Sequence, residues 1–180
     1  AAGQGFSHIV TAHHLDDQIE TFFINLLRGS GLNGLHGIPV KKGKVVRPLL
    51  FATRQQIHDY ASGNHLTWRE DSSNLTDKYL RNKIRHQIIP VLSEMNPAFR
   101  DIMSETFYRL KEVNNIFKQK IEEGRADLIE ETETETRILL SWLDEFGNHA
   151  TWLYELLKPF GFNFTVVEEI VKSLNGQSGK

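Results

Sequence analysis

The spacing of apolar residues changes early in the chain from a strand pattern to a helical pattern. Residues 7–12, with Ile9 and Val10 at their centre, predict a short buried strand, and we expect the rest of its sheet to lie upstream. The following apolar residues recur every three or four positions, which predicts a helix ending near Arg28 and Gly29. These residues are Leu15, Ile19, Phe22, Phe23, Leu26 and Leu27.

The next part of the chain mixes strand and helix signals. Residues 40–46 are predicted to form a hairpin with Gly43 in its turn. Thr53 is a good N-cap for a helix that ends at residues 63–64. Residues 66–68 are predicted to form a short strand.

A basic helix is predicted at about residues 78–95, and Pro90 should kink or divide it. Its expected apolar stripe consists of Leu80, Ile84, Ile88, Val91 and Met95. From Pro97 to Ile121 one long amphipathic face predicts a continuous helix. An acidic break follows at residues 130–135. Further helical patterns lie at residues 138–146, 151–159 and 166–174.

Composition limits the class of protein. The chain has 180 residues, 39% of them hydrophobic, which is enough to build a core. It contains no cysteine, which excludes disulfides and thiolate sites and fits a reducing compartment. The longest apolar runs are too short to span a bilayer, and no signal peptide opens the sequence. We therefore expect a cytoplasmic protein without a membrane partner.

The net charge of −2 hides an uneven distribution of charge. Residues 41–90 carry ten Lys and Arg against four Asp and Glu, whereas residues 91–180 carry ten against sixteen. The basic middle has two interpretations. It is either a surface for a polyanion such as tRNA or a nucleotide phosphate, or an ordinary solvated face.

The first candidate site is the sequence from His13 to Thr21, where a predicted strand passes into a helix. Ligands bind at this edge of open α/β sheets. His13, Asp17 and Glu20 share one helix face, and Asp16 lies beside them. Clustered carboxylates suit a cation, either Mg²⁺ or the ammonium of a substrate amine, whereas zinc fits these hard oxygens poorly. The alternative is a solvated acidic first turn with a capping histidine.

The second candidate is the glycine-rich stretch at residues 28–37, which begins Arg28-Gly29-Ser30-Gly31. Closely spaced glycines let backbone N–H groups approach a phosphate or a base. The signal is weak, because glycine-rich surface loops are common. The stretch matches neither a Walker A sequence nor a dinucleotide fingerprint.

The third candidate combines Glu70-Asp71-Ser72-Ser73-Asn74 with the basic helix that follows it. Arg81 and Arg85 lie one turn apart, on one face with Lys78. These cations would repel one another unless an anion sits between them, and a phosphate or carboxylate would suit the arginine side chains. The alternative is a basic surface helix paired with Asp71 or Asp77.

Together and in this order, the three motifs resemble the tRNA(Ile)-lysidine synthetase family of N-type PP-loop ATP pyrophosphatases. The resemblance is dense over residues 8–96 and is compatible with the rest of the chain. The H-H-x-D-D-x-x-E-T element also suits sister tRNA-thiolating enzymes, but R-G-S-G-L and E-D-S-S-N with R-N-x-I-R-H narrow the match to the lysidine family. The matching stretches are residues 11–21, 28–32, 34–35, 47–50, 68–74 and 81–90.

The resemblance implies an ATP-dependent ligase that joins L-lysine to C2 of the wobble cytidine of tRNA(Ile) with a CAU anticodon, through an adenylated intermediate and with Mg²⁺. It implies an α/β remnant of a parallel-sheet PP-loop domain at residues 1–60 and a mainly helical domain at residues 61–180, mostly α overall. The implied catalytic residues are Asp17, Glu20 and Arg81. The implied substrate-binding residues are His13, Asp16, Asn82 and Arg85, with Arg28, Gly29, Ser30 and Gly31 as a loop near the substrate. Metal ligands and oligomeric state are not indicated.

One departure from the family bears on activity. The phosphate-cradling S-G-G-x-D-S loop of the family does not occur in these residues, and its tRNA-acceptor-binding region is not found either. We therefore expect this stretch alone to be inactive. Two rival functions stay open at this point: a tRNA-thiolating PP-loop enzyme and a non-catalytic helical module that binds tRNA.

Overall fold

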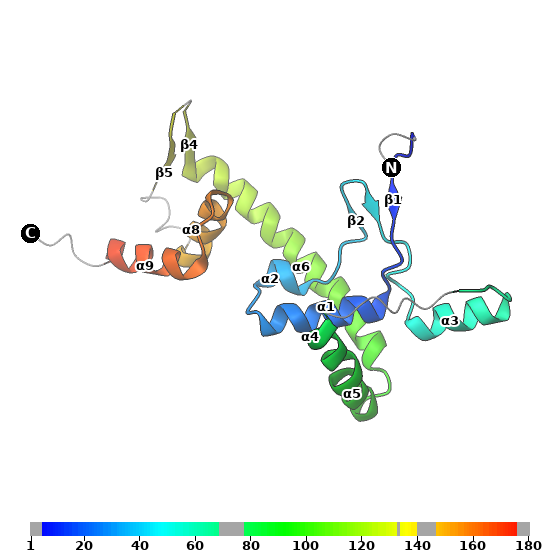
Figure 1. The fold of residues 1–180 in the computed structure, drawn as a ribbon. Coiled ribbons are helices and arrows are strands. Elements are labelled where there is room, and N and C mark those ends of the chain that lie inside the picture. Colours follow the sequence, from blue (N-terminus) through cyan, green and yellow to red (C-terminus); the bar gives the residue numbers. More distant parts are fainter. Residues whose placement is uncertain (1–4, 69–77, 133, 140–146, 176–180) are drawn as a thin grey trace, which may run out of the picture. The chain divides into compact units, whose positions relative to one another are not determined.

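The computed structural model describes residues 5–68, 78–132, 134–139 and 147–175. The chain forms two compact units, unit 1 from Ala1 to Asn114 and unit 2 from Asn115 to Lys180 (Figure 1). The described residues are mostly helical with small sheets, which confirms the predicted fold class. None of the described helices combines the length and the apolar content needed to cross a membrane.

Unit 1 contains a three-stranded sheet in the order β1-β3-β2. Strand β1 (Ile9–Val10) runs parallel to β3 (Val45–Val46), which pairs antiparallel with β2 (Lys41–Lys42). The predicted hairpin is confirmed, and Gly43 takes the left-handed conformation of its turn at φ 57°. The prediction of a buried strand at residues 7–12 is wrong in two respects. Only two residues are in strand conformation, and both are exposed because the described residues leave the faces of β1 uncovered.

Helix α1 (Leu15–Leu27) follows β1 and begins with a reciprocal cap. The His14 side chain accepts a hydrogen bond from the Asp17 N–H, and the Asp17 carboxylate accepts one from the His14 N–H. Such a cap satisfies backbone donors that a helix start otherwise leaves free. The helix ends at Arg28, as predicted, and Gly29 follows at φ 67°.

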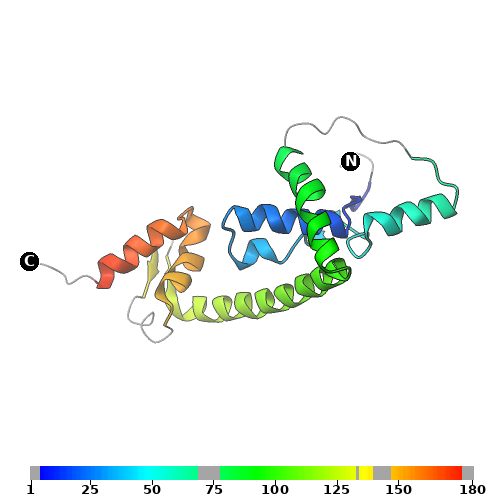
Figure 2. The same cartoon turned by 90° about the horizontal axis from the view of Figure 1, so that it is seen from below.

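Segments distant in sequence share the apolar face of α1. Helix α4 (Lys78–Lys83), the π-helical turn η2 (Ile84–Ile88) and α5 (Ile89–Met95) cross it, as Figures 1 and 2 show. The first part of α6 (Phe99–Leu128) completes this core. Its buried residues are Leu15, Ile19, Ile84, Ile89, Met103 and Phe107.

The π-helical turn corrects the predicted apolar stripe of the basic helix. Ile84 and Ile89 are buried, five positions apart, whereas Ile88, Val91 and Met95 are exposed. Pro90 supplies the reason, because it has no N–H and its ring crowds the carbonyl four residues earlier. The Ile89 N–H instead bonds the carbonyl of Ile84, which widens the helix by one residue.

Helix α3 (Arg54–Gly63) begins where the sequence predicts it. Thr53 and Gln56 form a second reciprocal cap, and Asn64 ends the helix. Residues 66–68 are irregular, so the short strand predicted there is wrong. The Glu70–Asn74 motif lies outside the described residues.

Unit 2 contains the rest of α6 and the elements after it. Strands β4 (Ile129–Glu131) and β5 (Thr136–Ile138) form an antiparallel hairpin where the sequence predicts only an acidic break. Helices α8 (His149–Leu157) and α9 (Phe164–Asn175) confirm two predicted helices, with the short turn η3 (Lys158–Phe160) between them. Of the helix predicted at residues 138–146, Ile138 is in a strand and residues 140–146 lie outside the described part. The buried core of unit 2 consists of Ile121, Leu128, Trp152, Leu153, Leu156 and Val167.

The division between the compact units differs from the predicted domain boundary. The sequence places that boundary between residues 60 and 61, whereas contacts within the chain divide it after Asn114. Residues 78–95 belong to unit 1 because their buried isoleucines pack on α1. A division by contacts within the chain need not coincide with the boundary between family domains. The boundary predicted at residue 60 therefore stays a prediction.

Candidate functional site

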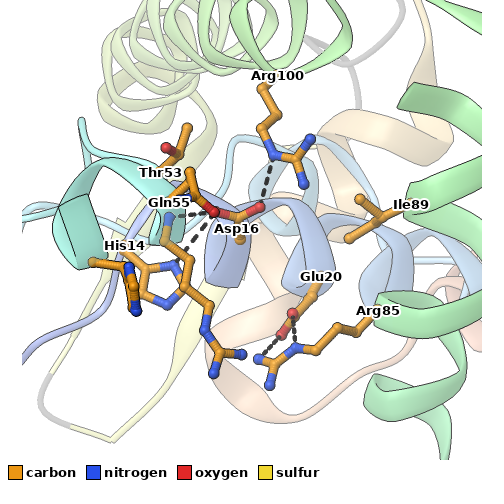
Figure 3. Close-up of a pocket in the computed structure, with 10 residues that line it drawn as sticks. His14, Asp16, Glu20, Thr53, Gln55, Arg85, Ile89 and Arg100 are labelled. Carbon is orange, nitrogen blue, oxygen red and sulfur yellow. Dashed lines mark hydrogen bonds and ion pairs between the residues drawn. The ribbon is translucent and has the colours of Figure 1, made fainter. Parts of the chain in front are cut away.

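A charged cavity of about 490 Å³ lies in unit 1 beside the start of α1 (Figure 3). This volume is within the range of small-molecule sites in proteins. Its walls come from α1 and its cap, the start of α3, η2, α5 and α6. The lining residues are His14, Asp16, Glu20, Thr53, Arg54, Gln55, His58, Arg85, Ile89 and Arg100.

The central feature of the site is an ion pair between Glu20 and Arg85. The Arg85 Nε donates to Glu20 Oε1 at 2.6 Å and an Arg85 terminal nitrogen donates to Glu20 Oε2 at 3.0 Å (Figure 3). The Glu20 side chain borders the cavity but has no exposed surface, because neighbouring groups cover it. A two-point contact of this kind fixes the orientation of the guanidinium as well as its position.

Two further charged residues lie beside this pair. The Nε of Arg81 is 3.6 Å from Glu20 Oε2, and the Arg81 side chain is 40% exposed. Asp17 Oδ1 lies 3.8 Å from a terminal nitrogen of Arg85. The hydrogen bond to Glu20 is the main reason why the pKa of Arg85 is raised. Burial alone would lower this pKa, whereas the negative charges of Glu20, Asp17 and Asp16 raise it further. The guanidinium therefore stays charged at any physiological pH.

Asp16 has both carboxylate oxygens engaged within the fold. Its Oδ2 accepts the Arg54 N–H at 2.7 Å, and its Oδ1 accepts the Arg100 Nε at 2.9 Å. Burial alone would raise the pKa of Asp16, but the hydrogen bonds from Arg54 and Arg100 outweigh it, so the pKa is lowered. Through these two bonds Asp16 connects the starts of α1, α3 and α6. Arg100 also donates a hydrogen bond to the Ser93 hydroxyl on α5.

His13 and Asn82, which were also predicted for the site, do not line the cavity. The Nδ1 of His13 is 2.9 Å from the Thr11 hydroxyl. Asn82 is half-buried on α4, next to Arg81 in the sequence. Of the predicted residues, the structure thus brings Asp16, Glu20 and Arg85 to the cavity wall and holds Asp17 and Arg81 next to them.

The predicted substrate loop from Arg28 to Gly31 lies at the other end of α1, which is 13 residues long, or roughly 20 Å. The loop is held by Asn25, whose side chain donates to the Gly34 carbonyl at 2.7 Å and whose carbonyl accepts the Ser30 N–H at 2.9 Å. A Cβ at Gly34 would lie 2.5 Å from that of Ser30. Packing within the loop therefore accounts for this glycine without a ligand.

The cavity also contains residues that the sequence did not indicate. Arg100 binds Asp16 across 84 residues of sequence, and the only local signal around it is the apolar spacing of its helix. His58 and Gln55 come from α3, whose sequence reveals a cap but no chemistry. These residues reach the site through tertiary packing, which a local pattern cannot show.

Guanidinium groups of this chain lie against the acidic face of α1, where the sequence predicts a bound Mg²⁺ or substrate ammonium. Arg85 and Arg81 flank Glu20, and Arg100 binds Asp16. Within the described part of the chain, no group of three or more His, Asp and Glu side chains is arranged to hold a metal ion. Asp16 and Glu20 are engaged by these arginines, and the use of Mg²⁺ stays a prediction. The capping role that the alternative interpretation gave to a histidine is correct for His14.

Comparison with known proteins gives two family matches. A PP-loop domain model matches residues 1–92, and a TilS substrate binding domain model matches residues 131–180. The first match extends past residue 60, the boundary predicted from the sequence.

Several curated relatives are each named tRNA(Ile)-lysidine synthase. That of Bacteroides thetaiotaomicron is 41% identical over 96% of this chain and 39% of its own length. A Porphyromonas gingivalis relative is 38% identical over 96% of this chain and 37% of its own length. One from Francisella philomiragia is 32% identical over 93% of this chain and 50% of its own length. The chain thus spans half or less of the length of these relatives.

Proposed function

Because the chain belongs to the PP-loop domain family, we propose that it is the part of a tRNA(Ile)-lysidine synthase in which lysine is joined to the tRNA. The relatives' names and the match to the TilS substrate binding domain support this assignment over a tRNA-thiolating enzyme. The observation that carries it is the buried contact of Glu20 with Arg85, since it brings two of the sequence motifs into one site.

The proposed reaction has two steps. The C2 oxygen of the wobble cytidine in the CAU anticodon of tRNA(Ile) bonds to the α-phosphorus of ATP, and diphosphate leaves. The ε-amine of L-lysine then forms a bond to C2, the bond from C2 to the AMP oxygen breaks, and the amine gives up a proton. Mg²⁺ enters the proposal only as the usual companion of ATP, because arginines engage the carboxylates of Glu20 and Asp16.

Arginine charge is the main contribution of this site to the proposed chemistry. Negative charge develops on the activated oxygen and on the departing phosphate, and fixed guanidinium groups stabilise such charge. Arg85 is held in place by Glu20, while Arg81 is partly exposed and free to face a substrate. Fully buried Glu20 therefore acts through the arginines, as the group that positions them.

Asp17 is the acid better placed to meet lysine. Its side chain is partly exposed, unlike that of Glu20, and one oxygen is held by the His14 N–H. We assign it to orienting the lysine amine and accepting its proton, with His13 and Asn82 as neighbouring substrate contacts. Asp16 has no free oxygen for this purpose, so we assign it to positioning.

A substrate contact is less well supported for the loop from Arg28 to Gly31 than for the cavity residues. Its distance from the cavity along α1 and its hydrogen bonds to Asn25 support a role in ending that helix. A contact with tRNA beyond the cavity stays a prediction for this loop.

The test is incorporation of labelled lysine by the full-length parent enzyme into tRNA(Ile) with a CAU anticodon. Wild type should incorporate lysine only with ATP. Asp17→Asn should reduce the rate roughly a hundredfold or more, because it removes the proton acceptor. Asp101→Asn, which changes an exposed acid in the first turn of α6, is the matched control and should stay near wild type. Transfer of sulfur rather than lysine would contradict the proposal.

A further inference from the structure

Two exposed aromatic rings lie in contact beside the cavity. The ring centroids of His58 and Trp68 are 5.2 Å apart, with the ring planes at 74°. Trp68 is 53% exposed and the His58 side chain is 57% exposed, so both rings are open to solvent. His58 lies on α3 and also lines the cavity, so the aromatic pair adjoins the cavity wall.

The wall that carries this pair is firmly held and positively charged. Asp16 binds the first N–H of α3, and the Thr53 cap fixes the same turn. Three arginines, Arg54, Arg85 and Arg100, line the cavity with His58, against the two carboxylates of Asp16 and Glu20. The surrounding sequence, residues 41–90, carries ten Lys and Arg against four Asp and Glu.

One acid lies close to the pair. Asp59 Oδ1 is 3.8 Å from the His58 Nδ1, and the same oxygen accepts a hydrogen bond from Gln55 at 2.8 Å. Among the described residues this carboxylate is shared between two neighbours, His58 and Gln55, so it does not reverse the sign of the charge around the rings.

We propose that His58 and Trp68 form a stacking subsite for an unpaired RNA base at the outer wall of the cavity. Aromatic faces next to a basic groove are how proteins hold single-stranded nucleic acid, because every base offers a π face and every phosphate a negative charge. A cationic ligand is disfavoured by the same arginines. The identity of the RNA as a tRNA anticodon rests on the proposed function, but the stacking subsite itself does not.

The experiment measures binding of a fluorescein-labelled, cytidine-containing RNA heptamer to this chain by anisotropy at low salt. Wild type should bind the single strand more tightly than a duplex of equal length. Trp68→Ala should weaken binding roughly tenfold to a hundredfold, and Trp68→Phe should retain most of it because a ring is kept. Tyr108→Ala is the control, since Tyr108 is a similarly exposed aromatic residue on α6.

Three results would overturn the subsite: no binding of the heptamer by wild type, a preference for the duplex, or unchanged affinity after Trp68→Ala. His58→Ala, on an exposed helical position, provides a second variant should Trp68→Ala fail to fold, and it should weaken binding in the same direction. The assay involves no lysine transfer. A parent enzyme that joins no lysine would therefore contradict the proposed function while leaving a Trp68-dependent interaction in place.

Discussion

The two compact units of this chain differ in what they bury. Unit 1 buries the charged residues Asp16 and Glu20 beside its apolar core, whereas the buried side chains described in unit 2 are all apolar. Paired charges are rarely the most stable way to fill a core, and apolar residues of similar volume often do as well or better. We infer from this difference that the proposed chemistry takes place in unit 1, and that the core of unit 2 contributes stability.

The largest expected effect comes from leaving a buried charge in unit 1 without its partner. Arg85→Met should cost about 3 kcal/mol of unfolding free energy, because fully buried Glu20 loses its two-point contact. Replacing both residues by Met should recover most of this stability but no lysine transfer. Denaturant unfolding measures the first effect and the lysine assay the second. Full stability of the single variant would show that water reaches Glu20.

A smaller effect is expected from a cavity in the apolar core of unit 2. Val167→Ala, at a side chain with no exposed surface, should cost about 2 kcal/mol through lost burial and incomplete repacking. The cost should be the same at pH 4 and pH 8, because no described charge is buried nearby. A pH-dependent cost in chemical denaturation would break the contrast between the units.

The smallest effect concerns Asp16 and the acid stability of unit 1. Its folded pKa lies below the ordinary value of 3.8, so it contributes stability above that value and loses it as pH falls through the folded pKa. Asp16→Asn should therefore cost about 1.5 kcal/mol near neutral pH and flatten the decline in stability below pH 4. A series of unfolding curves from pH 2 to pH 7 measures this. If Asp16→Asn and wild type lost stability equally below pH 4, Arg54 and Arg100 would not stabilise the Asp16 carboxylate.

Local patterns predicted the elements whose causes are local. The cap at Thr53, the turn at Gly43 and the end of α1 at Gly29 each follow from a few neighbouring residues. The predicted apolar stripe of the basic helix was wrong, although Pro90 was expected to disturb the helix. Its consequence is a hydrogen bond from Ile89 to Ile84, and no periodicity reveals that shift of register.

Local patterns predicted the two halves of the candidate site, whereas only the family resemblance implied that the halves face one cleft. The acidic face with Glu20 indicated a cation and the basic face with Arg85 indicated an anion, and the structure shows that each satisfies the other. Arg100 gave no signal, because a single arginine on an amphipathic helix is ordinary. Pairing across 65 or 84 residues depends on the packing of α4, η2 and α6 against α1, which the sequence pattern does not specify.

The most direct test of the arginine assignment is the turnover of the full-length Arg81→Lys enzyme at saturating ATP and lysine. Lysine keeps the charge but lacks the planar guanidinium, and a transition-state contact of this kind contributes about 3 kcal/mol. The account predicts a loss of roughly a hundredfold in turnover with an unchanged melting temperature, since Arg81 is partly exposed. Wild-type turnover would make Arg81 a surface cation, and a large fall in melting temperature would make it a structural partner of Glu20.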